Sequence, residues 1–431
     1  MDLYRLKRRM RRCAEAAMVR LAPLTHIVPE GARHRLRDAI LRLSGISKGR
    51  EPRRLPEAWQ PGRDPEGINL FGFFKAHNGL AQGVKLYASA IEKAGIPHSF
   101  LNTDFLYWLP QDDTAWDSRL SLQAPYAVNV VHINPDQWVE ATNCYPIRCF
   151  DGRYTIGVWL WELEDIPSAW SSAFPYVNEL WAPSRFIADA LRKTAPVPVT
   201  VIPYGIEAPQ DESLNRSDFG LPEDAFLVLV MYDANSYASR KNPEGAIRAF
   251  LEAFGAHPAR ARLVIKVNHP QKQDIRRIEQ LLGRDGPYIL LREAMDKPRL
   301  NRLIALCDVC LSLHRSEGFG LVMAEAMLLG VPTVATGWSA NTEFMPPDGS
   351  WLVDYTLVPV GTAYQYAEQG QRWADPDISC AAAILRSIER DPASARAIAA
   401  RGQAYIRSEF SPEVCARRMR DRLAAILSKG G

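Results

Sequence analysis

The stretch that decides the fold reads VCLSLHRSEGFGLVMAEAMLLG, residues 309–330. Its first five residues, Val309 to Leu313, are apolar or small and predict a buried strand. The glycines that follow predict a loop, and Leu321 to Leu329 predict a helix that Gly330 ends. A strand, a short loop and a helix in this order are typical of a parallel α/β sheet.

The loop of this stretch has the features of an anion site. The amides of Gly318, Phe319 and Gly320 precede the helix without partners inside it, and the helix dipole favours negative charge there. Glu317 comes before these amides and Glu325 lies on the helix beyond them. Two acids flanking a phosphate site suit a ligand with hydroxyls on both sides of a diphosphate, such as a nucleoside-diphosphate sugar. The alternative is a glycine-rich turn without a ligand. It leaves unexplained an acid among Ala, Met and Leu, where a buried carboxylate needs a partner.

Strands and helices alternate in both directions from this stretch. Strands are predicted at 68–74, 99–101, 127–132, 154–159 and 179–182, and again at 226–231, 262–267, 288–291, 309–313 and 333–335. Helices are predicted between them, at 84–94, 186–194, 243–256, 272–283, 297–305 and 379–389 among others. The pattern predicts an α/β fold of two Rossmann-like, doubly wound domains, with a ligand cleft at the carboxyl ends of the strands. We place the domains at 67–205 and 206–409, after an extension and linker at 1–66.

Two further groups of polar residues follow predicted strands. Arg240 and Lys241 come after the strand at 226–231 and before a helix that starts at Pro243. Two cations at such a place can neutralise a diphosphate leaving group, although surface cations are common. Asn78 and Gly79 follow the first strand, where a doubly wound sheet places ligand contacts.

Composition excludes several classes of protein. The chain is 47% hydrophobic and 23% charged, with a net charge of +3, so it is typical of globular proteins and gives no sign of nucleic-acid binding. Seven scattered cysteines argue against a disulfide scaffold and fit a reducing cytoplasm. The pair Cys307 and Cys310 has no partner pair for a metal, so we expect core thiols. The sequence contains no apolar run of about 18 residues, so we expect no transmembrane helix.

The N-terminal segment is strongly basic. Residues 1–54 contain fifteen Lys and Arg but five Asp and Glu, and apolar residues recur at helical spacing from Leu3 to Leu21. One interpretation is a helix on the anionic inner face of the plasma membrane. The other is a helix that packs on the protein or frays, and the sequence leaves both open.

Several motifs resemble family 4 of the retaining GT-B glycosyltransferases. Glu317 and Glu325 match its Glu-x7-Glu motif, residues 240–243 resemble its Arg-Lys-Asn-Pro element, and residues 339–345 resemble a further part of its donor region. Residues 159–163 and 181–186 are similar to signatures of a subgroup of bacterial polysaccharide and O-antigen assembly. The resemblance covers about residues 69–427, and implies a GT-B fold whose C-terminal helix, within 410–431, returns to the first domain. Ser411 and Pro412 are suited to begin that helix.

The resemblance also implies roles for single residues. Glu325 would hold the ribose hydroxyls, and Glu317 would hold the transferred sugar. The amides of Gly318, Phe319 and Gly320, with Leu321, would hold the donor phosphates. Arg240 and Lys241 would stabilise the leaving diphosphate, and His132 resembles a histidine beside the reacting sugar; a core or capping role for it is the alternative. Asn78 and Gly79 would contact the donor, although their loop departs from the family pattern.

The sequence therefore predicts a retaining hexosyltransferase, for example a mannosyl-, glucosyl- or rhamnosyltransferase. It would use a GDP- or UDP-sugar, need no metal or bound cofactor, and act on a glycan or lipid-linked acceptor in bacterial surface polysaccharide synthesis. We expect a cytoplasmic protein, peripheral on the plasma membrane in one interpretation. The alternatives are a catalytically silent scaffold of a polysaccharide assembly complex, and a phosphorylase or epimerase of the same fold.

Overall fold

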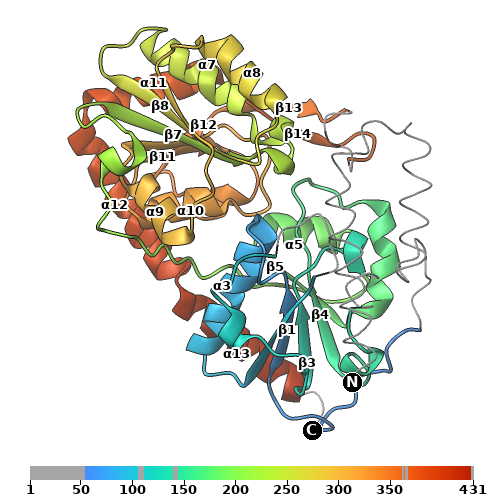
Figure 1. Ribbon diagram of the computed structural model, residues 1–431. Helices are drawn as coiled ribbons and strands as arrows, with labels where there is room; N and C mark the ends of the chain where they lie inside the picture. The colour runs from blue at the N-terminus through green and yellow to red at the C-terminus, as the bar shows by residue number, and fades with distance from the viewer. Residues whose placement is uncertain (1–53, 105–110, 139–143, 362–363, 365–366, 429–431) are drawn as a thin grey trace, which may run out of the picture.

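The computed structural model describes residues 54–104, 111–138, 144–361, 364 and 367–428 (Figure 1). Nearly all of the basic segment at residues 1–54 lies outside this range, so its contact with a membrane stays a prediction. No helix in the described part of the chain is long and apolar enough to cross a membrane.

The first sheet has six parallel strands in the order β2-β1-β3-β4-β5-β6. Their bounds are β1 Ile68–Gly72, β2 His98–Asn102, β3 Val128–Val131, β4 Tyr154–Val158, β5 Glu179–Ala182 and β6 Val199–Val201. Helix α3 (Gly79–Lys93) follows β1, and α5 (Arg185–Arg192) follows β5. Because β2 and β3 lie on opposite sides of β1, the strand order reverses between β1 and β3, the place where such sheets bind ligands.

The second sheet is also parallel, in the order β12-β11-β10-β7-β8-β9. Its strands are β7 Phe226–Asp233, β8 Ala261–Asn268, β9 Tyr288–Leu291, β10 Val309–Ser312, β11 Thr333–Thr336 and β12 Trp351–Val353. Its helices are α6 Ala238–Lys241, α7 Pro243–Phe254, α8 Lys272–Leu282, α9 Lys297–Ala305, α10 Leu321–Leu328 and α11 Ile378–Arg390. Here the order reverses between β7 and β10.

Helices cover both faces of the second sheet (Figure 1). On β7, Val228 and Val230 join a buried cluster with α7, α8 and α11, whereas Leu227 and Leu229 join a separate cluster with α9 and α10. Alternate residues of a strand point to opposite faces, so a strand buried on both faces is apolar throughout. Because β7 is buried on both faces, its sequence is a continuous apolar run, and this run predicted the strand correctly.

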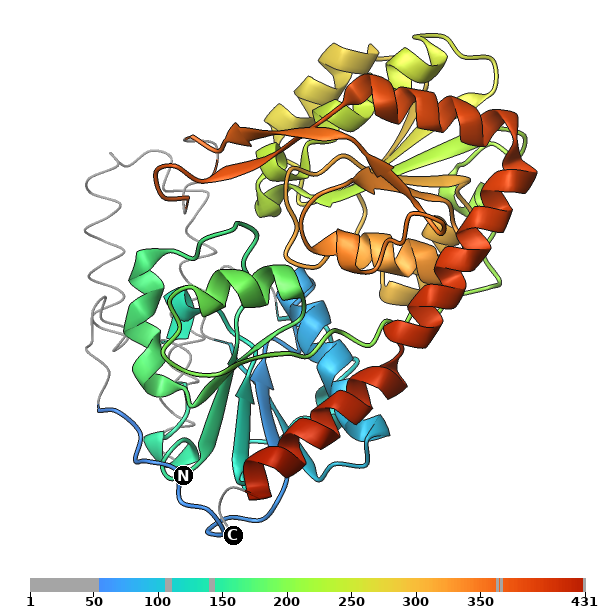
Figure 2. The same cartoon turned by 180° about the vertical axis from the view of Figure 1, so that it is seen from behind.

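The C-terminal helices connect the two domains. Helix α12 (Pro392–Glu409) packs against α10 of the second domain, and α13 (Pro412–Leu427) packs against α3 of the first (Figure 2). Ser411 caps α13 by accepting a hydrogen bond from the amide of Val414, which confirms the predicted start of the returning helix.

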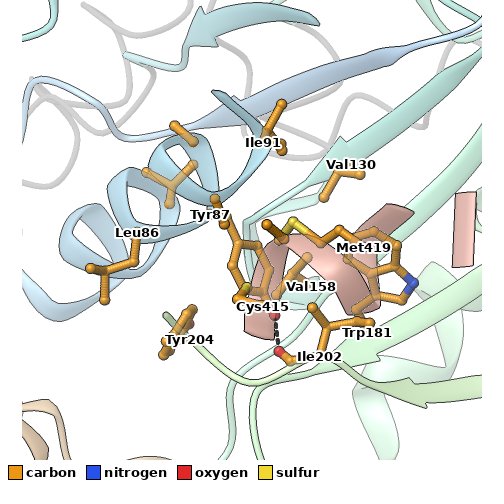
Figure 3. Packing of buried hydrophobic residues seen from close by; sticks show 14 of the residues in the cluster. Leu86, Tyr87, Ile91, Val130, Val158, Trp181, Ile202, Tyr204, Cys415 and Met419 are labelled. Carbon is orange, nitrogen blue, oxygen red and sulfur yellow. Dashed lines mark hydrogen bonds between the residues drawn. The ribbon is translucent and has the colours of Figure 1, made fainter. Parts of the chain in front are cut away.

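The returning helix is held by both apolar and charged contacts. Met419 and Cys415 of α13 lie beside Tyr87 and Trp181 of the first domain (Figure 3). Arg422 donates two hydrogen bonds, of 2.8 and 2.5 Å, to the fully buried carboxylate of Glu179 on β5.

Sequence reasoning missed α12, β12 and an antiparallel hairpin. The hairpin pairs β13 (Tyr355–Pro359) with β14 (Arg372–Pro376). Its Trp373 is buried in a cluster with Trp161 and Trp170 of the first domain. The hairpin thus belongs to the second half of the chain but packs against the first domain.

Candidate functional site

The main group of charged residues lies where the strand order of the second sheet reverses. Arg240 and Lys241 end α6, just after β7, and Glu317 lies in the loop after β10, the neighbour of β7. The sequence predicted the pair Arg240 and Lys241 separately from Glu317, which lies 76 or more positions later, and the fold brings them into contact.

Glu317 forms two ion pairs. Lys241 Nζ lies 2.5 Å from Glu317 Oε1, and Arg240 Nη1 lies 3.3 Å from Glu317 Oε2. Burial opposes ionisation of this carboxyl, but the two cations outweigh burial and lower the pKa of Glu317 to about 2. Burial likewise opposes the charge on Arg240, and the carboxylates of Glu162 and Glu317 raise its pKa nonetheless. Glu317 and Arg240 are therefore charged at neutral pH, whereas burial lowers the pKa of Lys241 and Glu317 partly offsets that effect.

Backbone contacts fix the cations against the loop. The amide of Arg315 donates to the carbonyl of Arg240 over 2.7 Å. Asn242, in the left-handed region at φ 51°, donates to the carbonyl of Leu313 and caps α7 by accepting from the amide of Gly245. The two segments that follow β7 and β10 thus hold each other in place.

The two glycines of the loop, Gly318 and Gly320, have different roles. Gly320 has φ 101°, which favours glycine, and it precedes the first turn of α10. A Cβ atom at Gly318 would lie 2.8 Å from the carbonyl oxygen of Trp161 in the first domain. Gly318 also accepts a hydrogen bond from the hydroxyl of Ser184, again from the first domain. The glycine at position 318 is therefore required for contact between the domains.

Two apolar residues, Phe319 and Leu321, flank Gly320 in the predicted donor loop. The ring of Phe319 is buried between Tyr204, Phe344 and Phe410, and Leu321 begins α10. The ring of Phe319 is therefore part of the core, and its backbone amide is the part of this residue that is consistent with the predicted phosphate contact.

Glu325 is buried in α10, as predicted, and its partner is Lys297 at the start of α9. Lys297 Nζ lies 2.5 Å from Glu325 Oε1. Burial raises the pKa of this carboxyl and the ammonium partly offsets the rise. Within the protein, Lys297 supplies the partner that a buried acid requires.

His132 follows β3, where the order of the first sheet reverses. Its Nε2 lies 2.8 Å from the hydroxyl of Tyr204, while Nδ1 has no hydrogen-bond partner among the described residues. Burial lowers the pKa of His132 to about 4, so the ring is neutral at neutral pH. Tyr204 in turn packs edge-on against Phe319, so one aromatic ring separates His132 from the donor loop.

Asn78 and Gly79 lie at the start of α3. The side-chain oxygen of Asn78 accepts a hydrogen bond of 2.9 Å from the amide of Ala81 and thereby caps the helix. Gly79 is exposed. The capping bond gives Asn78 a structural role in addition to its predicted contact with the donor.

The structure adds two residues to which the sequence assigned no role. Glu162 follows β4, and its Oε1 lies 3.5 Å from Arg240 Nη2. Tyr364, between β13 and β14, donates a hydrogen bond of 2.9 Å to Glu162 Oε2. Residues 159–163 resemble a signature of a family subgroup, but nothing in the sequence pairs Glu162 with a cation 78 positions later.

Within the described ranges, no three His, Cys, Asp or Glu side chains gather in a way that could hold a metal ion. Cys307 and Cys310 are both buried, and burial raises the pKa of Cys310 to about 12. The two thiols are therefore part of the core.

Comparison with known families adds evidence on the second half of the chain. Residues 233–375 match the family model described as "Glycosyl transferases group 1". This region contains Arg240, Lys241, Glu317 and Glu325.

Two curated relatives have the same description, D-inositol 3-phosphate glycosyltransferase. The protein of Nocardioides is 29% identical over 205 residues, which are 44% of this chain and 40% of the relative. The protein of Acidothermus cellulolyticus is 30% identical over 171 residues, 37% of each chain. The chain thus matches about two fifths of the length of these relatives.

Solved structures match over most of the chain. HepE of Anabaena, in complex with UDP and glucose, has a TM-score of 0.58 at 16% identity, covering 83% of this chain and 99% of that one. Sucrose-phosphate synthase of Thermosynechococcus elongatus has a TM-score of 0.61 at 16% identity, covering 84% and 100%. With the two parallel sheets and the returning helix, these similarities confirm the predicted GT-B fold.

Proposed function

We propose that this protein is a retaining glycosyltransferase that moves a sugar from a nucleoside-diphosphate sugar to an acceptor hydroxyl. The observation that carries the proposal is the contact of Arg240 and Lys241 with Glu317 at the reversal point of the second sheet. Open α/β sheets bind ligands at this point. The match of residues 233–375 to a glycosyltransferase family model supports the same conclusion.

The charges suit a diphosphate leaving group. Arg240 and Lys241 supply two fixed cations, and charge held in place before the reaction stabilises a developing negative charge without reorganisation. The start of α10, after Gly318 and Gly320, supplies amides and a favourable dipole for the same phosphates. Glu317, ionised between the cations, would accept hydrogen bonds from hydroxyls of the transferred sugar.

The reaction we propose is a front-face displacement. The leaving diphosphate would itself take the proton of the acceptor hydroxyl as that hydroxyl attacks from the same face, which retains the configuration of the sugar. Contacts between the domains, such as the hydrogen bond from Ser184 to Gly318, would exclude water from the loop and limit donor hydrolysis. Neutral His132 would contact the sugar from the first domain, and Glu325 would hold the ribose.

The proposed acceptor and biological role are supported by two short segments of the chain. We propose a glycan or lipid-linked acceptor in bacterial surface polysaccharide synthesis, because residues 159–163 and 181–186 resemble that subgroup. In this proposal residues 67–205 bind the acceptor, residues 206–409 bind a UDP- or GDP-sugar, and the basic N-terminus contacts the membrane. The UDP bound by HepE of Anabaena supports a uridine nucleotide as the first donor to test.

Nucleotide release tests the proposal. The purified protein is incubated with UDP-, GDP-, ADP- and dTDP-sugars, with and without a lipid-linked glycan fraction from bacterial membranes. Release that requires the acceptor fraction supports transfer. Release at the same rate without acceptor contradicts it in favour of hydrolysis, and an absence of binding and release with all donors contradicts it in favour of a scaffold protein.

A further inference from the structure

Glu162 connects the first domain to the cations of the second. It lies just after β4, its side chain is 24% exposed, and its Oε1 is 3.5 Å from Arg240 Nη2. Its backbone carbonyl accepts a hydrogen bond from the hydroxyl of Ser316, the residue before Glu317. Both contacts cross between the domains, so they form only when the domains are together.

The hairpin holds Glu162 from its other side. The hydroxyl of Tyr364 donates to Glu162 Oε2 over 2.9 Å. Farther along the same segment, Gln371 Nε2 donates to the carbonyl of Asp165, and Glu368 Oε1 accepts from the amide of Ser168. These contacts fix the segment after β4, and the carboxylate of Glu162 is held between Tyr364 and Arg240.

The hydrogen bonds of Arg240 leave one donor unused. Its Nη1 donates to the carbonyl of Ser316 and faces Glu317, and its Nη2 donates to the carbonyl of Ser236 and faces Glu162. Its Nε is buried and has no acceptor among the described residues. A buried donor without a partner, beside the proposed diphosphate site, is available to an acceptor that a ligand supplies.

We propose that Glu162 is a positioning residue for Arg240: together with Glu317, it fixes the guanidinium from opposite domains so that Nε–H is left for an oxygen of the donor diphosphate. The inference rests on the proposed function and extends it. In this arrangement the diphosphate site is complete only when the first domain contributes Glu162. Closure of the domains is thereby coupled to the orientation of the cation that stabilises the leaving group.

The opposite role for Glu162 is competition with the donor for Arg240. The two roles predict different effects of removing its charge, because a carboxylate repels a diphosphate. If Glu162 positions Arg240, its neutralisation slows the transfer step, whereas nucleotide affinity is not weakened, because the relieved repulsion offsets the lost positioning. If Glu162 competes with the donor, its neutralisation raises both nucleotide affinity and the transfer rate.

The test compares Glu162→Gln with the wild type in the full-length protein. Affinity for UDP or GDP, whichever the wild type binds, is measured by calorimetry, and kcat is measured from acceptor-dependent nucleotide release. We expect kcat to fall by about tenfold or more, as small misplacements of catalytic groups do, with the nucleotide Kd unchanged or lower. Glu164→Gln is the matched control, because its carboxylate forms no ion pair within the described part of the chain, and it should leave kcat unchanged.

A double-mutant comparison separates positioning from a general structural role. If Glu162 acts through Arg240, then Glu162→Gln adds no further loss of kcat in an Arg240→Gln background. An equal fractional loss in both backgrounds overturns the proposal, as does an unchanged or raised kcat of Glu162→Gln alone. A wild type that transfers no sugar from any donor overturns the proposed function and this inference with it, whereas an active wild type with a fully active Glu162→Gln overturns only the inference.

Discussion

Replacement of Lys241 by alanine is the perturbation whose effect the structure predicts most directly. In the folded protein the positive charges of Arg240 and Lys241 are balanced by the negative charges of Glu162 and Glu317. The change to alanine leaves this cluster with one uncompensated negative charge at the proposed place of the diphosphate. The donor would then meet net repulsion where it now meets a cation.

The size of this repulsion follows from Coulomb's law. One unit charge at about 5 Å from a phosphate charge, at an effective dielectric constant of about 20, corresponds to about 3 kcal/mol. That is about two orders of magnitude in rate, within the range for loss of one fixed donor to a developing negative charge. We therefore expect kcat/KM of Lys241→Ala to fall by about 100-fold or more.

The fold should survive the same change. Arg240 remains 3.3 Å from Glu317, so that carboxylate keeps one cation, and we expect the free energy of unfolding to fall by about 3 kcal/mol, the low end for removing one partner of a buried ion pair. The assay is the initial rate of acceptor-dependent nucleotide release, with urea unfolding in parallel. Lys272→Ala, at an exposed lysine of α8, is the control and should be silent. Wild-type rates in a folded Lys241→Ala protein would refute the role of Lys241.

Three further predictions concern single residues. The pKa of His132 in the folded protein is about 4, below its ordinary 6.5, so the unfolded chain binds more protons between these values and stability is lost as pH falls through them. The stability difference between the wild type and His132→Asn should therefore shift by up to about 3 kcal/mol between pH 7.5 and pH 4, measured by urea unfolding; a shift near zero would contradict a buried neutral ring. Glu325→Gln should weaken nucleotide binding by about tenfold or more, through loss of charge-assisted bonds to the ribose, and an unchanged Kd in calorimetry would exclude that contact. Arg422→Met should lower the free energy of unfolding by about 3 kcal/mol, because it leaves Glu179 fully buried without its cation, whereas exposed Arg417→Met should not; equal effects of the two would show that the ion pair adds no stability.

Most elements of the two sheets were predictable because their signals are local. Each strand is an apolar run with polar residues at its end, and Ser411, Gly320 and Gly330 end or begin helices through their own conformations or side chains. The proximity of Arg240, Lys241 and Glu317 was predictable from topology, since residues that follow parallel strands collect at one edge of the sheet. The contact between them follows from topology rather than from their spacing.

The long-range contacts of Glu162 and Glu179 were not predictable in this way. Glu162 meets Arg240, and Glu179 meets Arg422 across 243 positions, through packing that no local pattern encodes. The hairpin at 355–376 was missed because no residue of β13 is buried and the loop between its strands is long. At Asn78, a side chain suited to a ligand also caps a helix, and the sequence does not distinguish the two.

The configuration of the transferred sugar is the most direct test of the central claim. The wild type is incubated with its donor and acceptor, and the anomeric proton of the first product is followed by NMR before equilibration. We predict that nucleotide release requires the acceptor and that the product has the same anomeric configuration as the donor. A product of inverted configuration, or release of free sugar irrespective of acceptor, would contradict the account of the site around Glu317.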